Sequence, residues 1–249
     1  MAGHSHWAGI KHKKAAVDNK RGKIWSKLSR AIIVAAKAGG GDPETNIRLR
    51  TAIADAKGVS MPKDNITRAI KKGTGELAGG DLLELIYEGY GPGGVAVICD
   101  VLTDNRNRTA PEIRKLFETH GGKLGSTNCV AWNFDRKGLF LIPLDKVDEE
   151  RLMEIAMEVG AEDVQQTGDQ LELICDPEIY TDVADALETA EIPVDSKQVI
   201  RLAQNTITLS TDEARQVLNL MEALDDYDDV QNVSSNFDLS DEAMAELSG

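Results

Sequence analysis

The spacing of apolar residues predicts three short helices in the first third of the chain. The first helix spans residues 23–38, carries a basic stripe opposite its apolar face, and ends at Gly39-Gly40-Gly41, a strong stop signal. The second helix begins with Asp42 as its N-cap and Pro43 at its first position. The third helix spans residues 61–73. We expect the three helices to pack against one another as a small bundle.

Beyond a glycine-rich stretch at residues 73–80, segments that resemble strands alternate with segments that resemble helices. Residues 109–112 and residues 210–213 match the capping-box pattern, and each is predicted to start a helix. Many connections are as short as those of hairpins, which favours ferredoxin-like units over a long parallel sheet. We therefore predict the α+β class, with a helical domain followed by ferredoxin-like α/β structure.

Residues 89–94, with the sequence GYGPGG, match the GxGxxG pattern of dinucleotide-binding sites. In those sites a helix follows the glycines and holds the pyrophosphate at its N-terminus. Here the strand-like sequence Val95-Ala96-Val97-Ile98 follows instead. We therefore predict a hairpin turn at this position and no bound nucleotide cofactor.

The charge of the chain divides sharply along its length. The 249 residues carry a net charge of −14. Up to Lys72, 16 basic and 5 acidic residues give a net charge of +11, and the remaining 12 basic and 37 acidic residues give −25. Such an asymmetry indicates a polyanionic partner for the basic part. The acidic remainder is expected to repel nucleic acid, except where its few cations cluster.

The residues that would support catalysis or metal binding do not form a recognisable set. His4 and His6 lie two positions apart, without a cysteine or carboxylate spaced to complete a tetrahedral site. His120 and Cys129 flank a glycine-rich turn, but no third residue is placed to orient them as a nucleophile pair. We predict no catalytic residues, no metal and no cofactor.

Three cysteines, Cys99, Cys129 and Cys175, are widely spaced and form no CxxC pair, which predicts reduced thiols rather than disulfides. No apolar run approaches the roughly 18 residues that would suggest a membrane span. No signal peptide precedes the polar residues 3–7. We therefore expect a cytoplasmic protein without a membrane partner.

Basic residues concentrate in the first 30 positions, where Trp7 and Trp25 also lie. Lysine and arginine side chains contact phosphates, and an aromatic ring beside them can stack on a base. This pattern favours binding of nucleic acid, and the alternative is that the basic residues pair with the acidic domains of the same chain. The candidate nucleic-acid-binding residues are His4, Trp7, Lys11, His12, Lys13, Lys14, Lys20, Arg21, Lys23, Lys27 and Arg30.

Several strings along the chain resemble the YebC family of proteins. They are MAGHS at residues 1–5, IKHKKAA at 10–16, GGGDPE at 39–44, YEGYGPGG at 87–94, LTDNRNRT at 102–109 and DDVQNV at 228–233. The resemblance covers nearly the whole chain and is least specific across residues 136–201. Two positions depart from it, because His6 stands where the family carries lysine and Gly9 where it carries asparagine. The change to His6 removes a positive charge near the tip of the basic arm, which is the polar and basic segment of about 20 residues at the start of the chain.

The resemblance implies three domains, the third inserted into the second. On this sequence, the basic arm and helical domain occupy residues 1–76, an α/β domain occupies residues 80–134 plus 205–249, and an inserted α/β domain occupies residues 135–204. The resemblance also implies a non-enzymatic, nucleic-acid-binding regulator of gene expression, described in the family as a probable DNA-binding transcriptional regulator. The alternative is a ribosome-associated translation factor that binds ribosomal RNA and relieves stalled translation. The sequence leaves open the choice between DNA and ribosomal RNA, and the oligomeric state.

Two loops that match the family's strings form a candidate second surface, for contact with protein or RNA. One loop contributes Tyr90, and the other contributes Asn105, Arg106, Asn107 and Arg108. The alternative for the second loop is a purely structural role, in which an asparagine side chain closes an Asx turn ahead of the next helix.

Overall fold

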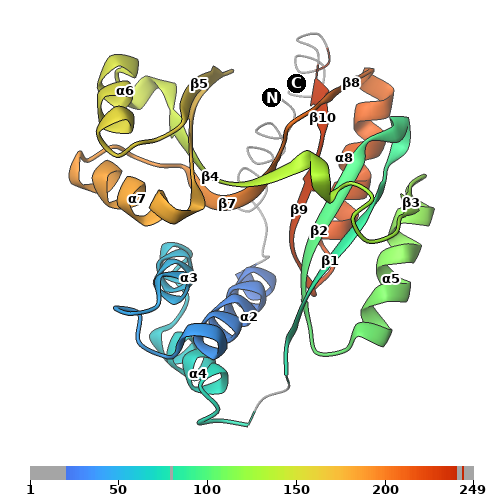
Figure 1. The fold of residues 1–249 in the computed structure, drawn as a ribbon, viewed down its shortest axis with the longest axis horizontal. Helices are drawn as coiled ribbons and strands as arrows, with labels where there is room; N and C mark the ends of the chain where they lie inside the picture. The colour runs from blue at the N-terminus through green and yellow to red at the C-terminus, as the bar shows by residue number, and fades with distance from the viewer. Residues whose placement is uncertain (1–20, 79–80, 240–242, 244–249) are drawn as a thin grey trace.

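Three helices form the N-terminal domain in the computed structural model, which describes residues 21–78, 81–239 and 243 (Figure 1). They are α2 (Arg21–Gly39), α3 (Ile47–Gly58) and α4 (Lys63–Gly73). Their apolar faces meet in a small aliphatic core that includes Ile32, Leu49, Ala56 and Ile66. The three predicted helices are therefore present, and each buries the face that its sequence pattern indicated.

The second helix begins at Ile47 rather than at Pro43, because Asn46 and not Asp42 is its N-cap. The Asn46 Oδ1 atom accepts a hydrogen bond from the Leu49 N–H at 3.1 Å. Its Nδ2 donates to the carbonyls of Ala35 and Gly40, both at 2.8 Å, and so ties α3 to the end of α2. A Cβ atom at Gly39 would lie 2.7 Å from this nitrogen, so glycine is needed there for close approach.

The middle domain contains an antiparallel sheet with the strand order β3-β1-β2-β9. The strands are β1 (Leu83–Tyr90), β2 (Ala96–Thr103), β3 (Lys123–Leu124) and β9 (Val230–Ser235). Helices α5 (Arg106–Thr119) and α8 (Thr211–Asp225) pack on one face and bury a large apolar core there. A short parallel pair, β8 (Ile207–Leu209) with β10 (Phe237–Leu239), borders this domain.

The GxGxxG segment joins β1 to β2, and residues Pro92–Gly94 form a single 3-10 turn between them. Gly93 has φ of 69°, a left-handed conformation that glycine adopts at little cost. The hairpin prediction is confirmed. The helix that follows β2 begins at Arg106, so the start predicted at residues 109–112 is wrong, whereas the capping box between Ser210 and Glu213 is present at the start of α8.

The third domain has the strand and helix order of a ferredoxin-like fold, and its sheet has the order β5-β6-β4-β7. Its elements are β4 (Phe134–Pro143), α6 (Glu149–Glu158), β5 (Asp163–Thr167), β6 (Gln170–Cys175), α7 (Tyr180–Thr189) and β7 (Ser196–Ala203). The apolar sides of α6 and α7 pack on one face of this sheet. The α+β class is thus confirmed, with a helical region followed by two sheet-containing domains.

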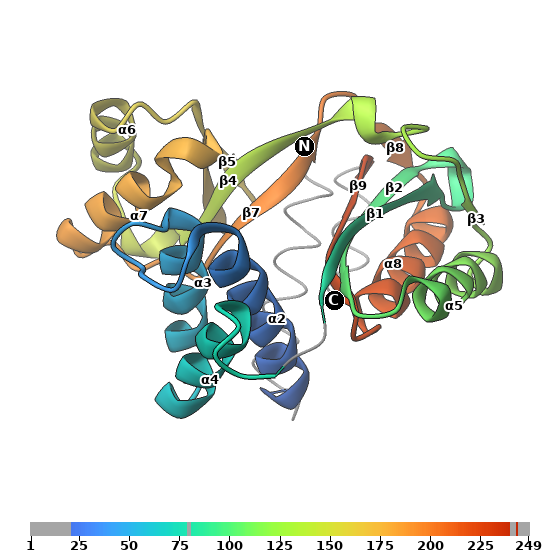
Figure 2. The same ribbon diagram turned by 60° about the horizontal axis from the view of Figure 1, so that its bottom comes forward.

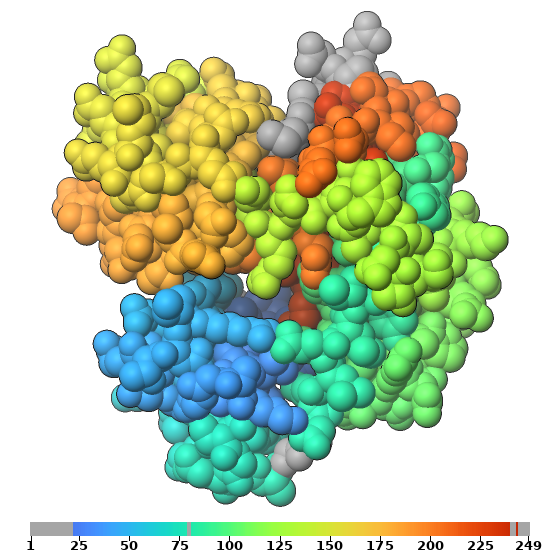
Figure 3. Space-filling model, in the orientation of Figure 1, coloured from blue at the N-terminus to red at the C-terminus, as the bar shows by residue number. Residues whose placement is uncertain are grey.

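The three domains surround a hollow of about 1340 Å³, visible between the blue helices and the rest of the molecule in Figure 3. Paired charges cross between domains at its rim. Arg48 of α3 donates two hydrogen bonds to Glu84 of β1, at 2.7 and 3.1 Å. Arg201 of β7 binds both carboxylate oxygens of Asp100 of β2, at 2.8–3.1 Å. Figure 2 shows how the domains are arranged: the helical domain lies beneath the third domain and beside the middle one.

Candidate nucleic-acid interface

Most of the predicted phosphate-binding arm precedes the part of the chain that the structure describes. His4, Trp7, Lys11, His12, Lys13, Lys14 and Lys20 lie outside the described residues, and Arg21 is the first residue of α2. Lys23, Lys27 and Arg30 are the predicted contacts whose surroundings the structure defines. Trp25 lies partly buried against the helical core and donates from Nε1 to the Val59 carbonyl at 3.3 Å.

The basic stripe of α2 faces residues 225–229, which we call the acidic turn, at the junction of α8 and β9. Lys27 Nζ lies 3.0 Å from Asp225 Oδ1 and donates to the Asp225 carbonyl at 2.6 Å. Lys23 Nζ lies 3.6 Å from Asp226 Oδ1. Arg30 lies 3.4 Å from Asp229 Oδ1 and also donates to the Asp228 carbonyl.

For these three residues, the structure therefore shows the alternative in which basic side chains pair with the protein's own acidic residues. Opposite charges at this spacing attract strongly where water is partly excluded. A phosphate group that contacted Lys27 would have to replace Asp225. Contact of Lys23, Lys27 and Arg30 with nucleic acid thus remains a prediction that requires exchange of these ion pairs.

The partly buried pair Lys27–Asp225 is expected to stabilise the domain contact more than the exposed pair Lys23–Asp226. Their side chains are 17% and 20% exposed in the first pair and 49% and 44% in the second. A double-mutant cycle with alanine, followed by urea denaturation, should give a coupling free energy of about 1 kcal/mol for Lys27–Asp225 and near zero for Lys23–Asp226. Equal coupling in the two pairs would contradict this assignment.

Helix α4 carries an exposed basic face whose residues are not among the predicted nucleic-acid contacts. Lys63, Arg68, Lys71 and Lys72 are all exposed, and none of them forms an ion pair within the described ranges. Ile66 and Ala69 occupy the opposite, buried side of this helix. The signal was present in the sequence, because four cations in eleven residues at helical spacing must share the solvent side once the apolar residues pack inward.

The structure does not bring the two loops of the candidate second surface together. Antiparallel pairing sets Tyr90 opposite Ala96 and Leu83 opposite Thr103. Tyr90 therefore lies at one end of the hairpin, and the segment 105–108 follows the other end.

The second loop is largely structural. Asn105 is the N-cap of α5 and accepts from the Arg108 N–H at 3.1 Å, as the Asx-turn alternative anticipated. Arg108 Nη2 lies 2.8 Å from Asp229 Oδ2 and 3.0 Å from Asp104 Oδ1. Arg106 and Asn107 remain exposed.

Trp132 is an exposed aromatic residue that lies just ahead of β4. Its side chain is 69% exposed, and residues Ala131–Asn133 form a 3-10 turn ahead of β4. The indole Nε1 donates to the Cys129 carbonyl at 3.1 Å. The Tyr90 hydroxyl donates to the same carbonyl at 3.1 Å, so the two aromatic side chains converge on one atom.

The cysteines and His120 are the remaining residues that the sequence raised as candidates for catalysis or metal binding. The three cysteines are free, and burial, followed by the charge of Glu88, raises the pKa of the Cys129 thiol. His120 Nδ1 lies 2.8 Å from the Leu116 carbonyl at the end of α5. Within residues 21–78, 81–239 and 243, no group of three or more His, Cys, Asp or Glu side chains is arranged to hold a metal. None of the helices in those ranges combines the length and the apolar character of a membrane span.

Ion pairs join the basic helical domain to the middle domain, and a further ion pair joins the middle domain to the third, which defines a three-domain α+β protein. Residues 5–76 match the TACO1/YebC protein N-terminal domain, and residues 82–237 match the TACO1/YebC second and third domain. The chain belongs to the TACO1/YebC family.

Relatives support this assignment over the full length of the chain. A "Probable transcriptional regulatory protein" of Natranaerobius thermophilus is 55% identical over 98% of this chain and 99% of the relative. One from Rhodopirellula baltica is 54% identical over 99% of this chain and 100% of the relative. A crystal structure of a conserved hypothetical protein from Aquifex aeolicus has a TM-score of 0.85 and 50% identity, over 95% of this chain and 98% of that one.

Proposed function

We propose that this protein is a non-enzymatic, nucleic-acid-binding regulator of gene expression, and that duplex DNA is its target. The observation that carries the proposal is the exposed face of α4, where Lys63, Arg68, Lys71 and Lys72 lie without carboxylate partners among the described residues. Relatives that share more than half of this sequence are named as probable transcriptional regulatory proteins, which favours DNA over RNA.

The division of charge gives this surface its selectivity. The helical domain is positive and the rest of the chain is strongly negative, so a polyanion is attracted to one side of the molecule and repelled by the other. Four cations along one helix suit a phosphate backbone, because lysine and arginine contacts position a protein on nucleic acid without reading bases. The predicted contacts of the arm, from His4 to Lys20, add to the positive charge of the same domain.

Binding to duplex DNA is expected to weaken steeply with salt, with a log–log slope of about −0.9 for each phosphate contact. Lys71→Gln combined with Lys72→Gln removes two contacts and should reduce the magnitude of the slope by about 2. Fluorescence anisotropy of labelled duplex DNA across a salt series measures both slopes.

Lys146→Gln is the matched control, because Lys146 is exposed on the third domain beside Asp145, and its slope should equal that of the unmodified protein. A flat salt response of the unmodified protein would refute nucleic-acid binding. Tighter binding to an RNA duplex than to DNA of the same length would instead support the alternative role in translation.

A further inference from the structure

Two exposed aromatic side chains, Tyr90 and Trp132, form a pair on the surface of the middle domain. Tyr90 is 44% exposed and Trp132 is 69% exposed. A large apolar side chain so accessible to water gains free energy when a partner covers it. Because Trp132 Nε1 and the Tyr90 hydroxyl both donate to the Cys129 carbonyl, what remains for a partner is mainly aromatic ring surface.

The fold holds this pair in place through a buried carboxylate. Glu88 is 4% exposed and accepts hydrogen bonds from the backbone N–H groups of Asn128, Val130 and Ala131, at 2.7–2.9 Å. These bonds fix the loop that carries the Cys129 carbonyl. A surface that is ordered before binding loses less conformational entropy when a ligand arrives.

The far end of the 3-10 turn is anchored as well. Asn133 is 3% exposed, its Oδ1 accepts from the Asn205 backbone and side chain at 3.0 Å, and its Nδ2 donates to the Asn205 carbonyl at 2.9 Å. Trp132 therefore projects from a short turn that is held on both sides. A side chain held in this way is ordered before any partner arrives, as a binding site requires.

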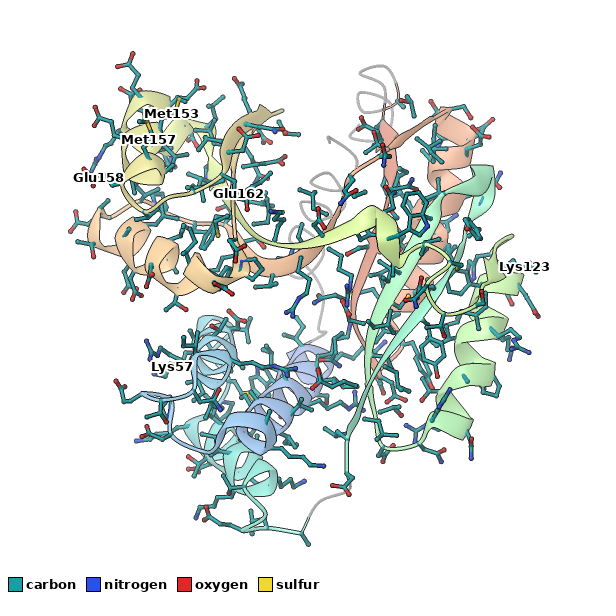
Figure 4. The ribbon with its side chains drawn as sticks, viewed as in Figure 1. Lys57, Lys123, Met153, Met157, Glu158 and Glu162 are labelled. Atoms are coloured by element: carbon teal, nitrogen blue, oxygen red, sulfur yellow. The ribbon has the colours of Figure 1, made fainter. Side chains whose placement is uncertain are left out.

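The charge around the pair indicates the kind of partner. Lys123 of β3 pairs directly with Tyr90 of β1, so the two side chains lie on the same face of the sheet. Figure 4 labels Lys123 at the outer edge of the middle domain, where it is exposed and forms no ion pair among the described residues.

We propose that Tyr90 and Trp132 form a stacking site for unpaired bases of single-stranded nucleic acid, with Lys123 contacting the adjacent phosphate. Aromatic side chains beside cations bind single strands by stacking, which tolerates any base because every base has a flat face. The shared ligand chemistry is a planar base on a charged backbone, and either DNA or RNA supplies it. The inference rests on the proposed nucleic-acid-binding function and adds a second, single-strand site to it.

The test compares Trp132→Ala with the unmodified full-length protein, using labelled oligothymidylate of about 15 nucleotides and an abasic strand of equal length. We expect Trp132→Ala to weaken binding of oligothymidylate about tenfold and to leave binding of the abasic strand unchanged. Trp132→Phe keeps a ring and should restore most of the loss. The same measurement with oligouridylate shows whether the site prefers RNA or DNA as the source of the bases.

The matched control is Met157→Ala, because Met157 is 78% exposed on α6 and lies, as Figure 4 shows, on the opposite side of the molecule from Lys123. This variant should bind both strands as the unmodified protein does. Equal weakening on the abasic strand would overturn stacking. No weakening on either strand would also overturn it and would assign the aromatic pair to docking of a protein.

The duplex experiment separates this inference from the proposed function. If Lys71→Gln combined with Lys72→Gln changes the salt slope on duplex DNA while Trp132→Ala leaves binding of oligothymidylate unchanged, that result refutes the stacking site alone. If the unmodified protein binds neither duplex nor single strand, both proposals fail.

Discussion

Replacing Asp229 with alanine is expected to lower the free energy of unfolding by about 3 kcal/mol. Asp229 is 3% exposed and directly precedes β9. Its Oδ2 atom accepts from Thr103 Oγ1 at 3.1 Å, Thr109 Oγ1 at 2.8 Å and Arg108 Nη2 at 2.8 Å, while Oδ1 faces Arg30. Alanine would leave two fully buried threonine hydroxyls without this acceptor and two arginines without their shared carboxylate.

The pH dependence of this loss follows from the ionisation of Asp229. Burial alone raises the pKa of this carboxyl, but hydrogen bonds from Arg108, Thr109 and Thr103 outweigh burial and lower its pKa below the usual value. A carboxyl with a lowered pKa stabilises the folded state above the ordinary value of about 4, and this contribution is lost as pH falls through the folded-state pKa. The difference in stability between the unmodified protein and Asp229→Ala should therefore shrink below about pH 4.

Urea denaturation at neutral and acid pH measures both effects, and Asp226→Asn is the control. Asp226 belongs to the same acidic turn, but its side chain is 44% exposed, so its replacement should cost less than about 1 kcal/mol. A loss for Asp229→Ala as small as that of Asp226→Asn would show that the buried network contributes little.

The apolar spacing was sufficient to predict most of the fold. It located α2 and α4, and the strand that follows GYGPGG excluded a dinucleotide site in favour of the hairpin that the structure contains. Short connections indicated ferredoxin-like units, which the order of β5-β6-β4-β7 confirms. These features depend on local sequence and on burial of one face, and both can be recognised without knowing the partner element.

Helix starts were less predictable, because the residue that caps a helix is chosen partly by distant contacts. Asn46 caps α3 in place of Asp42 because its amide also binds the end of α2. Asn105 caps α5 in place of Thr109, whose hydroxyl instead donates to Asp229, 120 residues further along the chain. A capping pattern in sequence cannot show which of two nearby side chains has the better tertiary partner.

The candidate interface could be predicted as a charge pattern but not as a surface. The basic stripe of α2 was evident in the sequence, whereas its ion pairs with the acidic turn join residues about 200 positions apart. Trp132 lies in the apolar run Val130-Ala131-Trp132, and the 3-10 turn before β4 turns it toward solvent. Both facts depend on long-range packing, so periodicity alone could not reveal them.

Ion pairs cross between the domains, and this bears on the proposed function. Lys27 with Asp225, Arg48 with Glu84, and Arg201 with Asp100 each connect elements of different domains. Under the proposed function, phosphates of a bound nucleic acid would compete for the same cations, and added salt weakens the exposed pairs. Binding of a polyanion would then be linked to the relative positions of the domains through one set of charges.

The second large effect is expected at Glu88, where alanine should lower the free energy of unfolding by about 2–4 kcal/mol. The side chain is buried, and its loss removes the acceptor for the N–H groups of Asn128, Val130 and Ala131. Glu88→Gln should cost about half as much, because one oxygen still accepts from Val130 and Ala131 while the new amide nitrogen faces the Asn128 N–H. Urea denaturation gives the stability, and hydrogen exchange at these three amides should accelerate in both variants.

Glu84→Gln provides the matched control, since Glu84 lies on the same strand and the same face as Glu88 but is 53% exposed and pairs with Arg48. An exposed ion pair contributes about 1 kcal/mol or less, so this variant should remain nearly as stable as the unmodified protein. If Glu88→Ala matched Glu84→Gln in stability and left the three amides protected, other contacts would be holding the loop. In that case the rigid presentation of Trp132 would not depend on Glu88.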